Sequence, residues 1–126
     1  GKMFDIRINS FENRLYIGLK GTIEQPEAAK GYERLAKGIK SLLPGFSVVM
    51  DIRGLEPATA DVRVIFLNMI KLFINAQVGI EVRVIDPKNQ AAAQIFQRIS
   101  RSLDYTAEEV YTIPDAERMI DEFYSE

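Results

Sequence analysis

The chain has 126 residues, of which 47% are hydrophobic and 27% charged, and its formal net charge at pH 7 is -2. This length suits one domain with one core, and the composition is that of an ordinary globular protein. The mild acidity, with basic residues scattered among acids, argues against a nucleic-acid surface, which needs clustered lysine and arginine. Because the chain has neither cysteine nor histidine, disulfides, thiolate nucleophiles, histidine acid–base pairs and the usual zinc sites are excluded.

The same composition bears on the cellular compartment. The lack of disulfides fits a reducing environment. No apolar run of signal-peptide length opens the chain, and its most apolar segment, 62–74, is interrupted by polar residues and is too short to span a bilayer of about 30 Å. We therefore expect a cytoplasmic protein without a membrane span, folded as a single domain over residues 1–126.

Two short segments near the N-terminus, 4–8 and 15–19, alternate apolar and polar residues. This period of two predicts strands that each bury one face, and the loop SFENR between them predicts an antiparallel hairpin. The next segment, 27–43, has the spacing of a helix. Its apolar stripe consists of Ala28, Tyr32, Leu35, Ile39 and Leu42. Gly31 and Gly38 fall near that stripe, which indicates either a close approach of this helix to the sheet or glycines tolerated at the surface.

Residues 46–52 form a nearly continuous apolar run rich in valine, which is typical of a central strand covered on both faces. A loop at 54–58 leads into a long apolar helix, 62–77, for which we expect Thr59 as the cap and Asp61 in the first turn. The remaining elements are a strand at 80–85, a helix at 89–103, a strand at 109–113 and a final helix after it. The spacing of Thr112 and Asp115 is that of a capping box for this final helix.

The alternation of strand and helix after residue 46 predicts parallel strands joined by right-handed crossovers. The predicted fold class is therefore an α/β domain with a mixed sheet of about five strands, an N-terminal antiparallel hairpin and about four helices.

Two carboxylates, Asp51 and Asp86, end neighbouring parallel strands at the edge of the sheet where ligands bind in this class of fold. Two carboxylates there suit a magnesium ion, which would imply a metal-assisted phosphohydrolase. The favoured alternative is that they accept hydrogen bonds from loop amides, because neither a third acid nor a phosphate-binding glycine loop accompanies them. We expect a non-enzymatic protein without catalytic residues, metal or cofactor.

The central strand carries the segment Val48-Val49-Met50-Asp51-Ile52-Arg53-Gly54, of the form VVxDxxG. Together with the order of elements over nearly the whole chain, this segment resembles STAS domains, the SpoIIAA-like family of anti-sigma-factor antagonists. The resemblance implies a bacterial regulatory domain of SpoIIAA-like architecture. It also implies that the loop after this strand and the helix that follows meet a partner protein.

The resemblance further implies a phosphorylatable serine at the start of that helix, in a D-S-S-G-like motif. This chain instead has Ala58-Thr59-Ala60-Asp61, with no serine and no glycine. Asp61, or Ala60 with the loop shifted by one residue, takes the acceptor position, so we expect a divergent branch without the serine phosphoswitch. Thr59 is the only hydroxyl in this loop, and a helix cap is favoured over a phosphorylation site for it.

The helix at 62–77 is apolar around nearly its whole circumference. One broad face is formed by Val62, Ile65, Phe66, Met69, Ile70 and Phe73, whereas other sides carry Val64, Leu67, Leu72 and Ile74. Such a helix is either covered by its neighbours or exposes an apolar patch of the kind that marks interaction sites. We take the last four residues as a candidate surface for a protein partner or a second copy of the chain. The alternative use of this surface is to line a pocket for a small lipophilic ligand.

Overall fold

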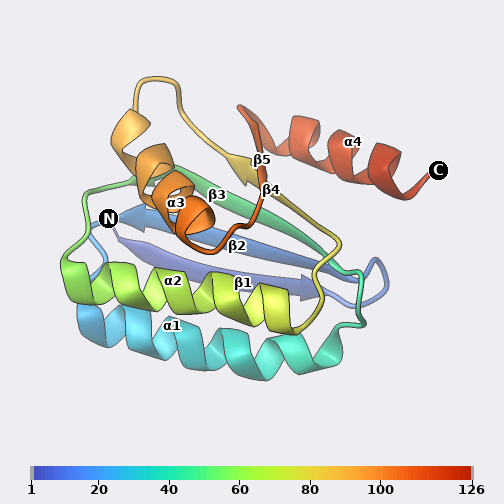
Figure 1. The fold of residues 1–126 in the computed structure, drawn as a ribbon, viewed down its shortest axis with the longest axis horizontal. Coiled ribbons are helices and arrows are strands. Elements are labelled where there is room, and N and C mark those ends of the chain that lie inside the picture. The colour runs from blue at the N-terminus through green and yellow to red at the C-terminus, as the bar shows by residue number, and fades with distance from the viewer. Residues whose placement is uncertain (1, 126) are drawn as a thin grey trace.

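A computed structural model describes residues 2–125 and has an α/β architecture built on one five-stranded sheet (Figure 1). The strands are β1 (Met3–Asn9), β2 (Arg14–Gly21), β3 (Ser47–Leu55), β4 (Ile80–Val84) and β5 (Glu108–Val110). The helices are α1 (Gln25–Gly38), η1 (Ile39–Ser41, a 3-10 turn), α2 (Ala60–Asn75), α3 (Gln90–Ser102) and α4 (Ile113–Tyr124). Within the described residues, no helix is both long and apolar enough to cross a bilayer.

The order of strands in the sheet is the order of strands in the chain, β1 to β5. The first pair is antiparallel and the other three pairs are parallel, which confirms the predicted mixed sheet with an N-terminal hairpin. Three successive crossovers of the same hand, all stepping in one direction, must place their helices on one face of the sheet. Accordingly α1, α2 and α3 share one large core with the sheet, and α4 packs on the other face against β3, β4 and β5.

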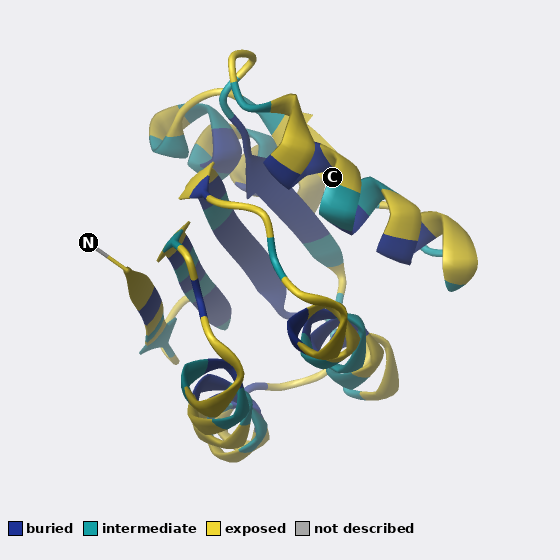
Figure 2. Cartoon of the chain, turned by 90° about the vertical axis from the view of Figure 1, so that its left-hand side faces the viewer, coloured by how far each residue is buried: buried dark blue, intermediate teal, exposed yellow. Residues whose placement is uncertain are grey.

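The central strand is β3, as the apolar run at 46–52 predicts. The side chains of Val48, Met50 and Ile52 enter the large core under α1, α2 and α3. Val49 is 1% exposed and packs in the smaller core beneath α4. Figure 2 shows the middle of the sheet as buried, with each helix turning a buried side inward and an exposed side to solvent.

Of the two alternatives left open for the glycines of α1, close approach to the sheet is the one present, and it is present at both. A Cβ atom on Gly31 would lie 2.5 Å from the ring of Phe4, and one on Gly38 would lie 2.6 Å from the Cδ1 atom of Ile8. The helix begins at Gln25 instead of residue 27, because Pro26 fits in a first turn, where its missing N–H costs nothing. Beyond Gly38 the segment predicted as one helix continues only as the 3-10 turn η1.

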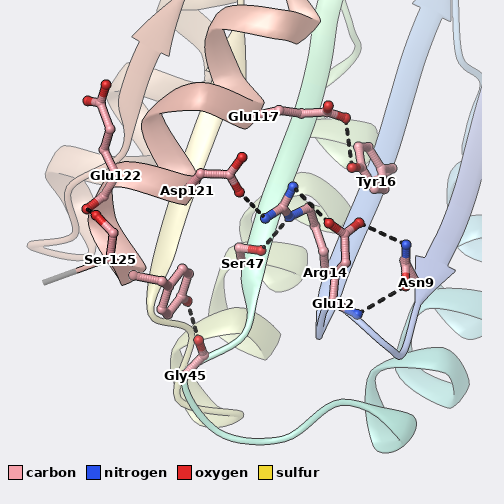
Figure 3. Close-up of polar contacts among 11 residues, drawn as sticks. Asn9, Glu12, Arg14, Tyr16, Gly45, Ser47, Glu117, Asp121, Glu122 and Ser125 are labelled. Atoms are coloured by element: carbon pink, nitrogen blue, oxygen red, sulfur yellow. Dashed lines mark hydrogen bonds and ion pairs between the residues drawn. The ribbon is translucent and has the colours of Figure 1, made fainter.

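Polar contacts join α4 to β2 and to the loop before β3 (Figure 3). Arg14 of β2, only 6% exposed, donates hydrogen bonds to Ser47 and to Asp121 of α4, each at 3.1 Å. The Tyr16 hydroxyl donates to Glu117 at 2.8 Å. The Tyr124 hydroxyl donates to the carbonyl of Gly45, so α4 is bound at several points along its length.

The strand predicted at 109–113 is shorter and earlier than expected, since β5 ends at Val110. Thr112 accepts a hydrogen bond from the Asp115 amide at 3.1 Å, which confirms the predicted cap and starts α4 at Ile113. Because Thr112 has to leave the sheet to cap the helix, the last residues of the predicted strand cannot pair with β4.

Candidate functional site

The first part of the candidate site is Asp51 of β3, which is bound by Arg53. Asp51 was expected to end its strand, but β3 continues to Leu55 because its last residues still pair with β2. The Arg53 side chain donates to both carboxylate oxygens, from Nε at 2.9 Å and from Nη2 at 2.8 Å, and its amide donates at 3.1 Å. Partial burial by itself raises the pKa of the Asp51 carboxyl, but these hydrogen bonds and the guanidinium charge outweigh burial and lower that pKa. Asp51 therefore stays ionised and has a cation of the protein as its partner.

Asp86, after β4, accepts a hydrogen bond from the Lys88 amide at 2.9 Å. This is the loop-amide contact that the sequence favoured over a metal ligand. Among residues 2–125, no group of three or more His, Cys, Asp or Glu side chains is arranged to hold a metal ion. The two aspartates thus have protein hydrogen-bond donors on their carboxylates and no third acid beside them.

The start of α2 differs from the prediction that Thr59 caps the helix through its side chain. Thr59 occupies the cap position, yet its hydroxyl bonds to no helix amide and donates to the Asp61 carboxylate. Asp61 accepts the Val62 amide at 3.0 Å. The hydrogen bond from Thr59, supported by the backbone amides, lowers the pKa of the Asp61 carboxyl. The predicted position of the cap is therefore confirmed, but the capping hydrogen bond is absent, because the nearby carboxylate is a stronger acceptor for the hydroxyl and for an amide proton than a neutral oxygen is.

The four candidate surface residues of α2 separate into two kinds. Val64 and Ile74 are 54% and 39% exposed, whereas Leu67 and Leu72 are half-buried and pack against the large core. Helical spacing places Leu72 on the opposite flank of α2 from Leu67. The four residues therefore do not form one patch, and Val64 and Leu67 are the pair that meets α3.

A groove runs between α2 and α3 and has a volume of about 390 Å³. Its lining, four residues from each helix, consists of Ala60, Arg63, Val64, Leu67, Ile95, Arg98, Ile99 and Ser102. We call it the α2–α3 groove. A neighbouring hollow, bordered in part by Pro57 and Ala58, shares Arg63, Ile95 and Arg98 with it. The groove thus extends to the loop that ends at Thr59, just before Asp61 in the first turn of α2.

The charge at the groove is positive. Arg63 and Arg98 are exposed at its sides, no carboxylate lines it, and no acid among residues 2–125 forms an ion pair with either arginine. The Arg63 side chain donates to the carbonyl of Ala58 and so borders the loop before α2. An apolar floor between two arginines suits an apolar ridge that carries acidic residues at its sides.

Sequence reasoning did not find the α3 half of this groove. Ile95 and Ile99 of α3 both border the groove, and Ile95 is only half-buried. A helical period shows which face is apolar but not which neighbouring helix it meets or where a gap remains.

A second feature that the sequence did not reveal is a buried ion pair on β4. Arg83 donates to Glu81 at 2.6 Å, and the Tyr105 hydroxyl donates to the same carboxylate at 2.9 Å. Both charged side chains are 2% exposed or less. Burial, together with the adjacent negative charge of Glu81, raises the pKa of the Tyr105 hydroxyl. The only sequence signal was two opposite charges at spacing two in a strand, which places them side by side on one face.

Comparison with known proteins adds no family to this description. No family model matches the sequence, and no curated protein matches it. The case for a function therefore depends on the site geometry and on the VVxDxxG segment at 48–54.

Proposed function

We propose that this chain is a non-enzymatic, cytoplasmic regulatory domain of the SpoIIAA-like (STAS) kind. It binds a protein partner through the α2–α3 groove and does not use a serine phosphoswitch. The observation that carries the proposal is the apolar floor of the groove, with Val64 54% exposed, between Arg63 and Arg98. An exposed apolar residue beside two cations that form no ion pair within residues 2–125 is better explained by contact with another molecule than by the stability of the chain itself.

The position of the groove supports the proposal. The groove adjoins the loop after the central strand, and this loop and helix are the elements that meet the partner in the resembled family. The element order, β-hairpin, helix, central strand, loop, helix, also matches that family.

The acidic start of α2 supports the absence of a switch. Asp61 is already ionised at the position where the resembled family carries its serine, and its carboxylate accepts both the Thr59 hydroxyl and the Val62 amide. The Asp61 carboxylate already supplies a negative charge at the positive end of α2. The charge at this position therefore does not depend on a kinase or phosphatase. We therefore propose one constitutive partner with an apolar ridge and acidic flanks.

The test uses a photo-crosslinking amino acid at position 64, with position 33 on the exposed outer side of α1 as the matched control. In the source cells we expect one protein to crosslink at position 64 and not at position 33. The purified partner should then bind the parent, and Val64→Glu and Arg98→Glu should each weaken binding by about tenfold or more, as for groups in the centre of an interface. Glu33→Lys should leave the dissociation constant within about twofold.

Two outcomes contradict this proposal. Crosslinks only to a second copy of the chain would make the groove a homodimer surface. A purified partner whose affinity is unaffected by both groove variants would place the contact elsewhere on the molecule.

A second candidate is a carrier of a small lipophilic ligand, favoured by the volume of about 390 Å³, which falls in the range of known ligand pockets. Titration with a fluorescent fatty acid distinguishes the two functions. Micromolar binding that Leu67→Glu abolishes would favour the carrier, whereas no saturable binding would favour the protein partner.

A further inference from the structure

One outer edge of the sheet is β1, which is longer than the strand at the opposite edge. This strand has seven residues, whereas β5 at the opposite edge has three. Figure 2 shows the strand that starts at the label N on the outside of the sheet. An edge strand presents unpaired N–H and C=O groups that can hydrogen-bond to another strand.

The hydrogen bonds of β2 show which backbone groups of β1 face outward. The Ser47 amide of β3 donates to the Asn13 carbonyl at 3.1 Å, so odd-numbered residues along β2 direct their backbone groups to β3 and even-numbered residues to β1. The register pairs these even-numbered residues with the odd-numbered residues of β1. The groups that point away from the sheet therefore belong to Phe4, Ile6 and Ile8.

Arg34 of α1 agrees with this direction, since its guanidinium donates to the Phe4 carbonyl at 2.6 Å. A carbonyl oxygen has two lone pairs, so this contact leaves the Phe4 oxygen able to accept another hydrogen bond. Over residues 2–125, no other side chain hydrogen-bonds to the outer row of β1.

We propose that a second copy of this chain adds to β1 in the antiparallel direction, about a two-fold axis at Ile6. This joins the two sheets into one continuous sheet. In this register Ile6 lies opposite Ile6, and Phe4 lies opposite Ile8, so outward groups meet outward groups. Met3 lies opposite Asn9, which means that the strand pairs along its whole length.

The charges on the exposed face of β1 select this register. It places Asp5 opposite Arg7 of the second copy, twice by symmetry, at sites where side chains of paired strands come closest. The two nearest alternative registers that keep outward groups opposite one another are centred on residue 5 or on residue 7. They would place Asp5 opposite Asp5 or Arg7 opposite Arg7, which is unfavourable. Both side chains are exposed, neither has an ion-pair partner among residues 2–125, and Arg7 is fixed over the ring of Tyr16 at 4.0 Å.

This contact does not depend on the proposed function. The α2–α3 groove lies on two helices that do not adjoin the free edge of β1, so both copies keep it open. The variant Val64→Glu should therefore leave the dimer intact, which allows failure of one proposal to be distinguished from failure of the other.

The test is sedimentation equilibrium of the parent and of charge variants at protein concentrations up to about 1 mM. We expect a monomer–dimer equilibrium for the parent. Asp5→Arg and Arg7→Asp should each raise the dimer dissociation constant by about tenfold or more, because each puts two like-charged pairs opposite one another. An equimolar mixture of the two variants should form a heterodimer, since Arg at 5 and Arg at 7 of one chain then face Asp at 7 and Asp at 5 of the other.

Hydrogen exchange adds a residue-level readout. The Ile6 and Ile8 amides should be protected in the parent at high concentration and exchange fast in Asp5→Arg, while thermal melts show that this variant is folded. A parent that is monomeric throughout overturns the proposal. So does a dimer that both single variants leave unchanged, or one that Val64→Glu abolishes.

Discussion

Arg14 of β2 and Asp121 of α4 form an ion pair at 3.1 Å although they lie 107 residues apart in the chain. Together with the Arg14–Ser47 hydrogen bond, this pair connects the N-terminal hairpin, the central strand and the last helix. The Arg14 side chain is 7% exposed and that of Asp121 is 69% exposed, so the buried end of the pair is the arginine.

This asymmetry predicts unequal effects of the two substitutions. Arg14→Met should lower the free energy of unfolding by about 2 kcal/mol, since it removes hydrogen bonds from a charged donor and leaves Ser47 without its partner. Asp121→Ala should cost about 1 kcal/mol or less, because solvent screens its carboxylate. Urea denaturation measures both values. If the two variants lost equal free energy of unfolding, Arg14 would not be the more buried partner of the pair in solution.

Val49 provides a test of the smaller core. Val49→Asp should abolish cooperative folding, because an unpaired carboxylate between β3 and α4 costs several kcal/mol out of a total of about 5 to 15. Circular dichroism during heating measures this. A cooperative transition within a few degrees of the parent would mean that α4 does not cover this position in solution.

The two glycines of α1 should respond differently to alanine. At Gly31 the new Cβ meets the ring of Phe4, which is itself buried, so Gly31→Ala should destabilise by about 1–3 kcal/mol. At Gly38 the new atom meets the flexible end of Ile8, and the gain in helix propensity of about 1 kcal/mol offsets the contact. Thermal unfolding of the two variants side by side is the measurement, and equal destabilisation would contradict the difference in neighbours.

Asp51 should contribute to stability in a pH-dependent way. Its pKa is lower in the folded chain than in the unfolded chain, so its contribution is complete above the unfolded value of about 3.9 and is lost as the pH falls through the folded pKa. Asp51→Asn should therefore lose less stability than the parent as the pH falls below about 4. Arg53→Gln should behave similarly, because it removes the donor that lowers the pKa. If both variants lost stability at low pH as steeply as the parent, the Asp51–Arg53 pair would not be the cause of this pH dependence.

Thr59 should remain unphosphorylated when the chain is incubated with serine/threonine kinases from its source. Its hydroxyl is hydrogen-bonded to the Asp61 carboxylate, and a phosphate there would place about two further negative charges beside an existing one. Intact-mass spectrometry, with Thr59→Val as the control, measures the modification. Stoichiometric phosphate on Thr59 that changes partner binding would restore the ordinary switch of the resembled family, with threonine in place of serine.

Elements set by local pattern were predictable from the sequence, whereas most contacts between elements were not. The nearly continuous apolar run at 46–52 is typical of a strand buried on both sides, and β3 is the central strand. The spacing of Thr112 and Asp115 identified a cap that the structure contains. At Thr59 the same kind of reasoning gave the cap position but not the hydrogen bond, because a carboxylate two residues away binds its hydroxyl.

The candidate site was predictable on the α2 side only. The exposure of Val64 follows from its position off the main apolar face, whereas Arg98 and Ile95 belong to the groove only because α3 lies beside α2. Likewise, the pairing of Glu81 with Arg83 follows from their spacing, but their burial follows from the segments packed over β4. Such facts depend on how elements are placed in space, which a single sequence pattern does not encode.

The strands lie in the sheet in the same order as in the chain, and this has a consequence for synthesis on the ribosome. Each new strand finds its neighbour already folded, so the sheet can grow in step with translation. One face of the sheet cannot be covered in this way. It is formed in part by Val49, Val82 and Val84, and within the described residues the helix that covers it is α4, the last element of the chain. A nascent chain therefore displays this valine-rich face until α4 emerges, and this is the interval in which it most needs a chaperone.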